Sequence, residues 1–241
     1  MSFLPGITTP YGNDWRCQIS SLDVLKNVHH IALFPTTISN LEEREGFCQM
    51  LEERNSWLTC PAVHLRDDME LWEYEEFLAL GGRVFNLHAT PRALRFVQDN
   101  PDIAGTIFVE NGYYIDETYW QMLRICGGAC VDLAHLEDFG FLQRNAGYDR
   151  LIEELPEIEV GMTHIAAVRD EPHQTPCGNG VGTELTYEDH FVGEFPGELK
   201  YLRRPEILAV VRRCRWNCIE LNNPINDQMI YVEYIKNIIS L

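Results

Sequence analysis

The stretch Cys130-Val131-Asp132-Leu133-Ala134-His135-Leu136 is a short apolar run that carries an aspartate and, three residues later, a histidine. An ionisable pair at the end of a buried strand needs partners, so a functional site explains it better than packing does. Five other apolar runs also end on a residue of metal-ligand type. They are Ala62-Val63-His64, Val84-Phe85-Asn86-Leu87-His88, Ile107-Phe108-Val109-Glu110, Val160-Gly161-Met162-Thr163-His164 and Cys218-Ile219-Glu220. The pattern predicts a ring of ligands.

Apolar runs alternate with segments of helical periodicity along the whole chain. The expected strands are Phe3–Thr8, His30–Pro35, Leu58–Leu65, Arg83–Ala89, Gly105–Glu110, Ala129–Leu136, Glu159–Ala167 and Asn217–Leu221. The expected helices are Ser21–Val28, Asn40–Arg54, Asp68–Leu80, one that begins at Thr90-Pro91, Asp116–Cys126, Tyr148–Leu155, Leu199–Arg213 and Gln228–Ile239. Repeated strand–helix units imply parallel strands, and eight of them predict an α/β fold: a single (β/α)8 TIM barrel over residues 1–241. The active site of such a barrel lies at the C-terminal ends of its strands, where all the ligand-type residues fall.

Composition limits the possible functions. The chain has 241 residues with 45% apolar content, enough for a substantial core, and no composition break marks a linker. We expect a cytoplasmic, soluble protein without a membrane segment, because no leader pattern and no apolar run of about 18 residues is present. The eight cysteines are irregularly spaced, as expected for free thiols in a reducing compartment. The net charge of −18 disfavours nucleic acid as a substrate.

The segment from about residue 169 to 197 has no strong periodicity, and loops of this length inside a compact domain are usually functional or mobile. We expect a lid over the site, with Gly178, Gly180 and Gly182 absorbing the backbone rotation. Closure of the lid would bring His190 or Glu194 towards the substrate. A disordered insertion is the alternative.

The Asp132-x-x-His135 pair, and the order His, His, Glu, Asp-x-x-His, His, Glu along the chain, resemble the xylose-isomerase-like barrels, a superfamily that includes sugar isomerases and epimerases and the AP endonucleases of the endonuclease IV type. The resemblance covers the third to the eighth expected strand. It implies that Glu110, Asp132, His164 and Glu220 bind one divalent ion of manganese, magnesium, cobalt or zinc. Three carboxylates and one imidazole form a hard, anionic cage that suits such an ion.

The endonuclease-like branch of this superfamily implies further ions, giving one to three in total. In that branch His64 and His88 would join Glu110 around a second ion. His135 would bind a third ion together with His190 from the loop after the seventh strand. The loop sequence departs from that branch, since His190 lies one residue closer to Gly193 and Phe195 replaces a glycine. A histidine alone at a strand end, such as His64 or His88, is equally compatible with a structural or substrate-binding role.

Three enzymatic hypotheses follow for a small-molecule substrate. The first is an isomerase or epimerase of a small sugar or sugar phosphate, in which Glu110 and Glu220 exchange a carbon-bound proton and His135 and His88 hold substrate hydroxyls. The second is a multinuclear phosphoesterase, and the third is an iron-dependent oxidase on the same ligands. A non-enzymatic binding or metal-storing barrel and a homo-oligomeric state both stay open.

Overall fold

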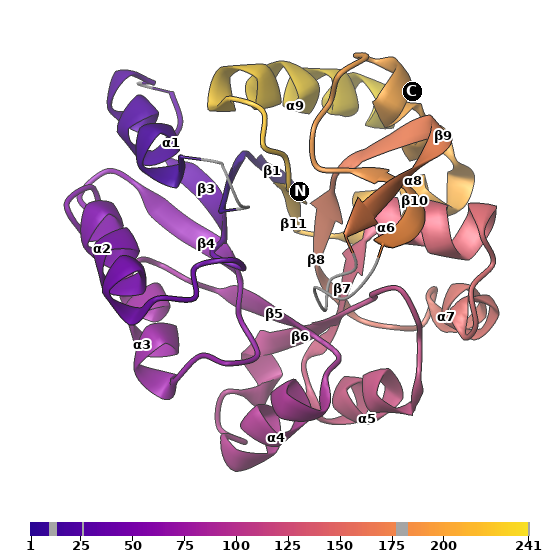
Figure 1. Cartoon of the computed structure of the whole chain (residues 1–241), viewed down its shortest axis with the longest axis horizontal. Coiled ribbons are helices and arrows are strands. Elements are labelled where there is room, and N and C mark those ends of the chain that lie inside the picture. The colour runs from indigo at the N-terminus through magenta and orange to yellow at the C-terminus, as the bar shows by residue number, and fades with distance from the viewer. Residues whose placement is uncertain (10–13, 26, 177–182, 241) are drawn as a thin grey trace.

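The computed structural model describes residues 1–9, 14–25, 27–176 and 183–240. The fold is α/β, with a nearly closed, parallel, barrel-like sheet surrounded by helices (Figure 1). Nine strands follow one another in the order β1, β11, β8, β7, β6, β5, β4, β3, β2. Their bounds are Ser2–Leu4 for β1, Gly6–Thr8 for β2, His30–Phe34 for β3, Thr59–His64 for β4, Val84–His88 for β5, Ile107–Glu110 for β6, Gly128–Asp132 for β7, Val160–Ile165 for β8 and Trp216–Ile219 for β11.

The two ends of the sheet are neighbours along the chain. The expected first strand is divided at Pro5 into β1, which pairs with β11, and β2, which pairs with β3. Proline has no N–H for a strand ladder, so it interrupts the strand, while its carbonyl oxygen accepts a 2.9 Å hydrogen bond from the Ala32 N–H. Gln228 of α9 (Ile225–Ile239) fixes this region, because its Oε1 accepts from the Gly6 N–H at 2.7 Å and its Nε2 donates to the Gly6 oxygen at 3.0 Å.

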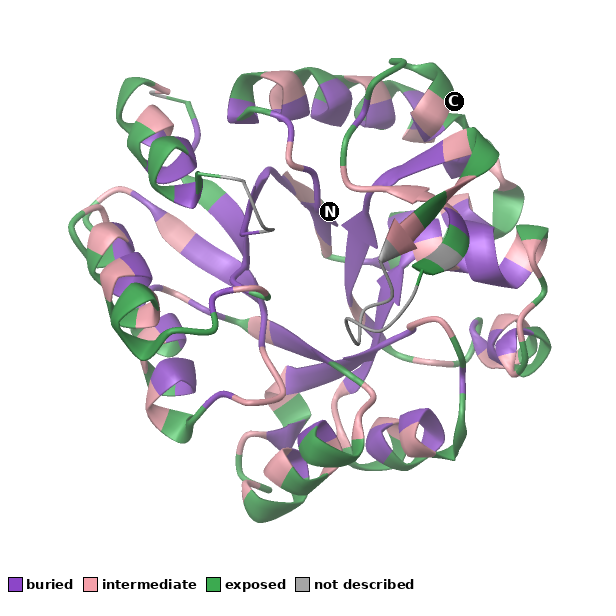
Figure 2. Cartoon of the chain, in the orientation of Figure 1, coloured by how far each residue is buried: buried purple, intermediate pink, exposed green. Residues whose placement is uncertain are grey.

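Helices ring the sheet, with their exposed faces outward and their buried faces against the strands (Figure 2). They are α1 (Trp15–Ser21), α2 (Leu41–Glu52), α3 (Leu71–Ala79), α4 (Pro91–Asp99), α5 (Glu117–Ile125), α7 (Tyr148–Glu154), α8 (Pro205–Arg213) and α9. The side chains of Asn40, Thr90 and Asp116 accept backbone N–H groups at the starts of α2, α4 and α5. The expected helix Ser21–Val28 is wrong, because the Asp14 carboxylate caps the chain earlier and α1 begins at Trp15.

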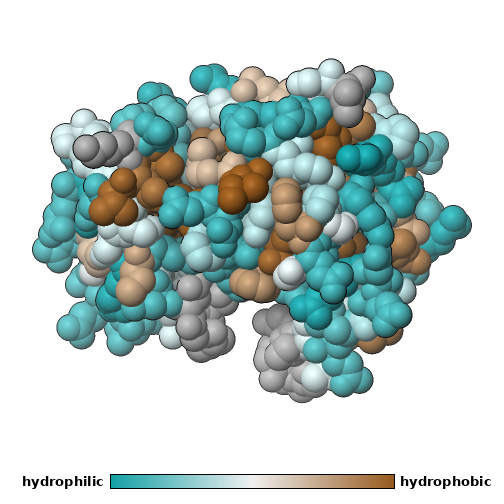
Figure 3. Space-filling view, turned by 90° about the horizontal axis from the view of Figure 1, so that it is seen from above, coloured by the Kyte–Doolittle hydropathy of each residue, from teal (hydrophilic) through white to brown (hydrophobic). Residues whose placement is uncertain are grey.

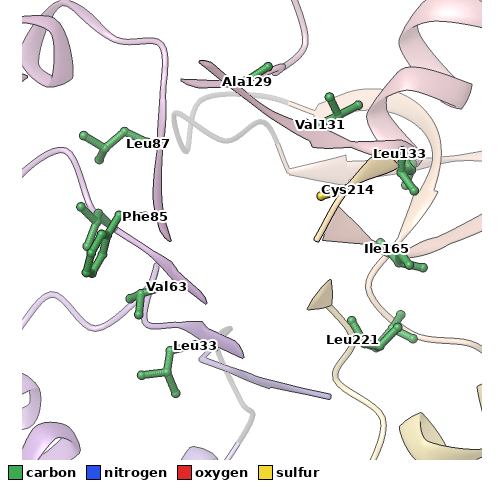
Figure 4. Close-up of a cluster of buried hydrophobic side chains, with 14 of the residues drawn as sticks. Leu33, Val63, Phe85, Leu87, Ala129, Val131, Leu133, Ile165, Cys214 and Leu221 are labelled. Carbon is green, nitrogen blue, oxygen red and sulfur yellow. The ribbon is translucent and has the colours of Figure 1, made fainter. Parts of the chain in front are cut away.

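Strand residues alternate between two apolar layers. Outward side chains, among them Leu33, Val63, Phe85, Val131 and Ile165, pack between the sheet and the helices (Figure 4). The inward side chains form a second cluster at the centre of the sheet. That inner cluster consists of Leu4, Ala32, Phe34, Ala62, Phe108, Cys130, Met162 and Cys218. The strands of a parallel sheet covered by helices are buried on both faces, which explains their nearly continuous apolar sequences.

The segment after β8 contains a hairpin. Strands β9 (Ala167–Pro176) and β10 (Thr183–Asp189) pair antiparallel in a separate two-stranded sheet beside the end of β8 (Figure 1). The 3-10 turns η4 (Gly197–Arg203) then lead into α8. The glycines Gly178, Gly180 and Gly182 lie outside the described residues, so the expected lid motion stays a prediction.

The molecular surface is mostly hydrophilic on the side shown in Figure 3, with hydrophobic residues in small groups. Within the described part of the chain, no helix has the length and apolar character that crossing a membrane requires.

Candidate metal centre

The ligand-type residues at the strand ends point to the same side of the sheet because of the two-residue period of a strand. Five of the six lie two positions after a residue of the inner cluster: Glu110 follows Phe108, Asp132 follows Cys130, His164 follows Met162, Glu220 follows Cys218, and His64 follows Ala62. Strand register brings them level, with His88 opposite Glu110 and Asp132 opposite His164. The chain therefore gathers these side chains at one end of the barrel-like sheet.

The first donor group consists of Glu110, Asp132, His164 and Glu220, whose ligand atoms all lie within 4.8 Å of one another. His164 Nδ1 is 3.5 Å from Glu110 Oε2 and 3.1 Å from Glu220 Oε2. All four residues are buried. The structure thus brings together the four residues that the sequence resemblance assigns to one ion.

The second donor group, His64, His88 and Glu110, shares its carboxylate with the first. His64 Nδ1 lies 2.8 Å from the Leu65 carbonyl oxygen, which can only accept, so Nδ1 carries the proton. His64 Nε2 therefore faces Glu110 Oε2 at 3.0 Å and His88 Nε2 at 3.1 Å. A lone pair in that position opposes the carboxylate, so this nitrogen requires either a second proton or a bound cation.

The third donor group consists of Asp132, His135 and Glu188. The expected strand Ala129–Leu136 is too long, because β7 ends at Asp132 and its carboxylate caps the helical turn α6 (Leu133–His135), accepting the His135 N–H at 2.8 Å. His135 therefore stands on a helical turn. Its Nδ1 donates to the Asn111 oxygen at 2.8 Å, which aims Nε2 at Glu188 Oε2, 2.8 Å away.

Glu188 is the site residue that the sequence reasoning did not single out. It belongs to β10 of the hairpin, and its side chain is 10% exposed. The only sequence signal is its place in the run Tyr187-Glu188-Asp189-His190. His190 Nδ1 lies 3.4 Å from Glu188 Oε1, so the predicted ligand His190 is next to the third group, with its side chain 44% exposed. Glu194 is exposed, and its backbone N–H donates to Glu198.

The charges within the site are strongly coupled. Burial raises the pKa of Asp132 to about 7, and the neighbouring carboxylates add to this effect against the opposing influence of His135. Burial alone would raise the pKa of Glu220, but the His164 imidazolium lowers it to about 2. Burial alone would lower the pKa of His64 and His135, but neighbouring carboxylates raise both. Without a cation, Glu110 and Glu220 are therefore matched by protonated histidines, whereas Asp132 holds a proton of its own up to a pH of about 7.

A divalent ion fits these donors. Three buried atoms in the groups make no hydrogen bond to a described residue, namely His164 Nδ1, Asp132 Oδ2 and Glu188 Oε1. An unpaired buried polar atom is costly, and here each one faces other ligand-type atoms. Cys130 Sγ also lies near, 3.4 Å from His164 Nε2, but burial raises the pKa of this thiol well above its usual range. It therefore acts as a neutral neighbour of His164.

A cavity of about 1120 Å³ opens onto the three groups. Its floor includes Glu110, Asp132 and Glu220, and the half-exposed His88 stands at one side. The ring of Tyr113 packs edge-on against Tyr114 and at a tilt against Phe139 on another side, and the hairpin contributes Thr175 and Leu185. No lysine or arginine of the described residues lines it. The volume suits a small molecule.

No protein-family model, no curated protein and no solved structure matches the chain. The likeness to xylose-isomerase-like barrels therefore stays a prediction based on the residues quoted for it.

Proposed function

We propose that the chain is a divalent-metal-dependent phosphoesterase that acts on a small molecule. The observation that carries this proposal is the sharing of carboxylates, since Glu110 belongs to the first and second donor groups and Asp132 to the first and third. Ions held by donor groups that share a carboxylate would lie close enough to act on one substrate group, as two-metal hydrolysis requires. A site for a single ion, formed by Glu110, Asp132, His164 and Glu220, would leave His64, His88, His135 and Glu188 outside the ligand set.

We also propose that the fold is an eight-stranded barrel of the xylose-isomerase-like type. Support comes from Pro5, the single residue between β1 and β2, since these two short strands take up the places of one strand next to β11 and β3. The strand-end donors Glu110, Asp132, His164 and Glu220 lie at the C-terminal edge of the sheet, where barrels of this type carry their active sites.

The ions would be held by His64, His88 and Glu110 in one group, by Glu110, Asp132, His164 and Glu220 in the next, and by Asp132, His135 and Glu188 in the third. Manganese, magnesium, cobalt, zinc and iron all accept subsets of these donors. When bound, such ions supply Lewis acidity and lower the pKa of a water molecule.

The chain's own residues orient these donors. The Leu65 and Asn111 carbonyl oxygens fix the ring orientations of His64 and His135. The Asn86 side chain donates to the Glu110 carboxylate. The Asn111 side chain accepts the backbone N–H of Asp132 at 2.8 Å and donates to the backbone carbonyl oxygen of Asp132 at 3.0 Å. Outer partners of this kind are worth roughly 10- to 100-fold in metal affinity. His88 is half exposed at the cavity wall and is placed to contact a substrate.

The proposed substrate carries a single phosphoester. The net charge of −18 repels polyanions such as nucleic acid over the whole surface, and the described wall of the cavity has no lysine or arginine to hold additional phosphates. The negative charge of the phosphate would therefore be neutralised only by the ions held in the donor groups.

A metal-dependent isomerase or epimerase is the second candidate. The observation in its favour is the convergence of Glu110 and Glu220 on His164 Nδ1, which places two carboxylates at one point where they could remove and return a carbon-bound proton. In this candidate His135 would hold a substrate hydroxyl.

One set of assays separates the two candidates. The protein is stripped of metal, reloaded with manganese or cobalt, and incubated with small phosphomonoesters and phosphodiesters and, separately, with sugars and sugar phosphates in deuterated water. We expect metal-dependent phosphate release that is lost in Glu110→Gln and kept in the control Glu117→Gln, which changes an exposed residue. Deuterium uptake at carbon without phosphate release would identify the isomerase instead.

A further inference from the structure

We propose that Asp138 is a positioning residue that holds Glu188 against His135 and thereby determines the metal affinity of the third donor group. This inference rests on the proposed multinuclear centre. Asp138 is fully buried in the π-helical segment η3 (Leu136–Leu142), outside the donor groups themselves.

The carboxylate of Asp138 binds the hairpin at three consecutive residues. Its Oδ2 accepts the backbone N–H of Tyr187 at 2.8 Å, the backbone N–H of Glu188 at 3.0 Å and the hydroxyl of Thr186. Its Oδ1 accepts Gln143 Nε2 at 2.8 Å. Both carboxylate oxygens of Asp138 therefore accept hydrogen bonds. Oδ2 fixes the backbone of Glu188, the residue whose carboxylate contacts His135.

The short segment from Asp132 to Asp138 carries two of the three ligands and also the residue that positions the third. Asp132 ends β7 and caps α6, and His135 and Asp138 follow it at intervals of three residues on the continuous helical backbone of α6 and η3. Asp132 and His135 supply two ligands of the third group, and Asp138 draws in the third ligand from β10. The distance of 2.8 Å between His135 Nε2 and Glu188 Oε2 is thus set by hydrogen bonds between the barrel and the hairpin.

The neighbouring residue Glu137 provides a matched control. Its carboxylate is also buried in η3, but it pairs with Arg204 at 2.5 and 2.8 Å, on the side of the chain that leads into α8. Loss of either buried carboxylate should reduce thermal stability, because each leaves donors without a partner. Only loss of the Asp138 carboxylate should lower the metal affinity of the third donor group.

The test is a cobalt(II) titration of the metal-free protein, followed by the visible absorption of the bound ions, with the melting temperature recorded in parallel. The variants are Asp138→Asn, Thr186→Val and Glu137→Gln. Asparagine has nearly the size of aspartate, but its amide group faces N–H donors on whichever side it lies. Thr186→Val keeps the carboxylate and removes one donor, so it carries the test if Asp138→Asn does not fold.

We expect one cobalt ion to bind about 10- to 100-fold more weakly in Asp138→Asn and less than 10-fold more weakly in Thr186→Val. The remaining ions should bind to these two variants with the affinity of the parent protein. Glu137→Gln should bind every ion with the affinity of the parent protein. Wild-type affinity for every ion in Asp138→Asn, or in Thr186→Val where Asp138→Asn does not fold, would overturn the positioning role while leaving the metal centre intact. A parent protein that takes up no cobalt would instead refute the proposed centre, and the positioning role with it.

Discussion

Asp132 faces two of the donor groups and also caps the helical turn that carries His135. Its pKa is raised to about 7, first by burial, whereas the carboxyl of an unfolded chain titrates near its model value of 3.8. The folded, metal-free protein therefore binds a proton that the unfolded chain has released, and this residue destabilises the fold increasingly as pH rises from 3.8 through about 7.

Asp132→Asn should therefore stabilise the metal-free protein at pH 8 and weaken its metal binding. An amide oxygen can still cap the turn at His135, so the fold is kept. The stabilisation should shrink as pH falls below about 7, where the aspartate of the parent is protonated. Thermal unfolding at pH 5 and pH 8, with metal content measured beside it, checks both parts. Asp99→Asn, on the exposed end of α4, is the control. Unchanged metal content in Asp132→Asn would mean that Asp132 is not a metal ligand.

The strand-end donors can be predicted from sequence because a strand has a period of two residues, so a polar residue two positions after an inward apolar one must also face inward. Glu110, Asp132, His164 and Glu220 satisfy that rule. Glu188 does not, since its place depends on hydrogen bonds that its own and the preceding backbone N–H donate to Asp138, which lies 50 residues away in sequence. Nothing in the local pattern of β10 indicates that contact.

Helix starts are the elements that sequence predicts well here, because a capping side chain acts on the next three residues. Asn40 and Thr90 show this. The end of β7 is predicted badly, because Leu133, Ala134 and Leu136 continue the apolar run, and a short apolar run does not distinguish a strand from a buried helical turn. The hairpin β9–β10 is missed for another reason: it lacks an apolar face along much of its length.

Gly6 lies where the two ends of the sheet meet, and Gly46 of α2 serves as a comparison. A Cβ at Gly6 of β2 would lie 2.1 Å from the Ile219 oxygen and 2.7 Å from the Phe34 ring, whereas a Cβ at Gly46 of α2 would meet nothing within 4 Å. Gly6→Ala should cost about 1–3 kcal/mol or more of unfolding free energy through overpacking. Gly46→Ala should add about 0.5–1 kcal/mol, because alanine favours the helix.

Urea unfolding of both glycine variants measures these changes. Stability equal to the parent in Gly6→Ala would mean that β2 does not pass against the end of β11, and that the sheet is more open than the structure shows. The gain in Gly46→Ala shows in the same experiment that the method resolves small differences.

At the scale of the whole molecule, proton binding and metal binding compete. The pKa of His135 is raised by the carboxylates of Asp132 and Glu188 despite burial, so its protonation stabilises the metal-free fold below about pH 6.5, and this stabilisation is lost as pH rises through the folded-state pKa. Glu220 acts oppositely, because its lowered pKa of about 2 gives stability above pH 4.5 that is lost as pH falls. The metal-free protein should therefore be most stable near pH 5–6.

Metal loading should raise the melting temperature more at pH 9 than at pH 6, because at pH 6 the ions must displace protons from the histidines. Differential scanning calorimetry of metal-free and manganese-loaded protein at the two pH values measures the effect. An equal shift at both would mean that the ions bind away from His64, His135 and His164.

The most direct test of the central claim is a crystal structure of the manganese-loaded protein with anomalous scattering recorded for the metal. We predict anomalous peaks within the group of Glu110, Asp132, His164 and Glu220 and in at least one of the two adjoining groups, with the contacts of 3.0 Å between His64 and Glu110 and 2.8 Å between His135 and Glu188 replaced by bonds to the ions. The absence of any peak there, with both histidine–carboxylate pairs still in direct contact, would contradict the claim and leave these residues as buried ion pairs.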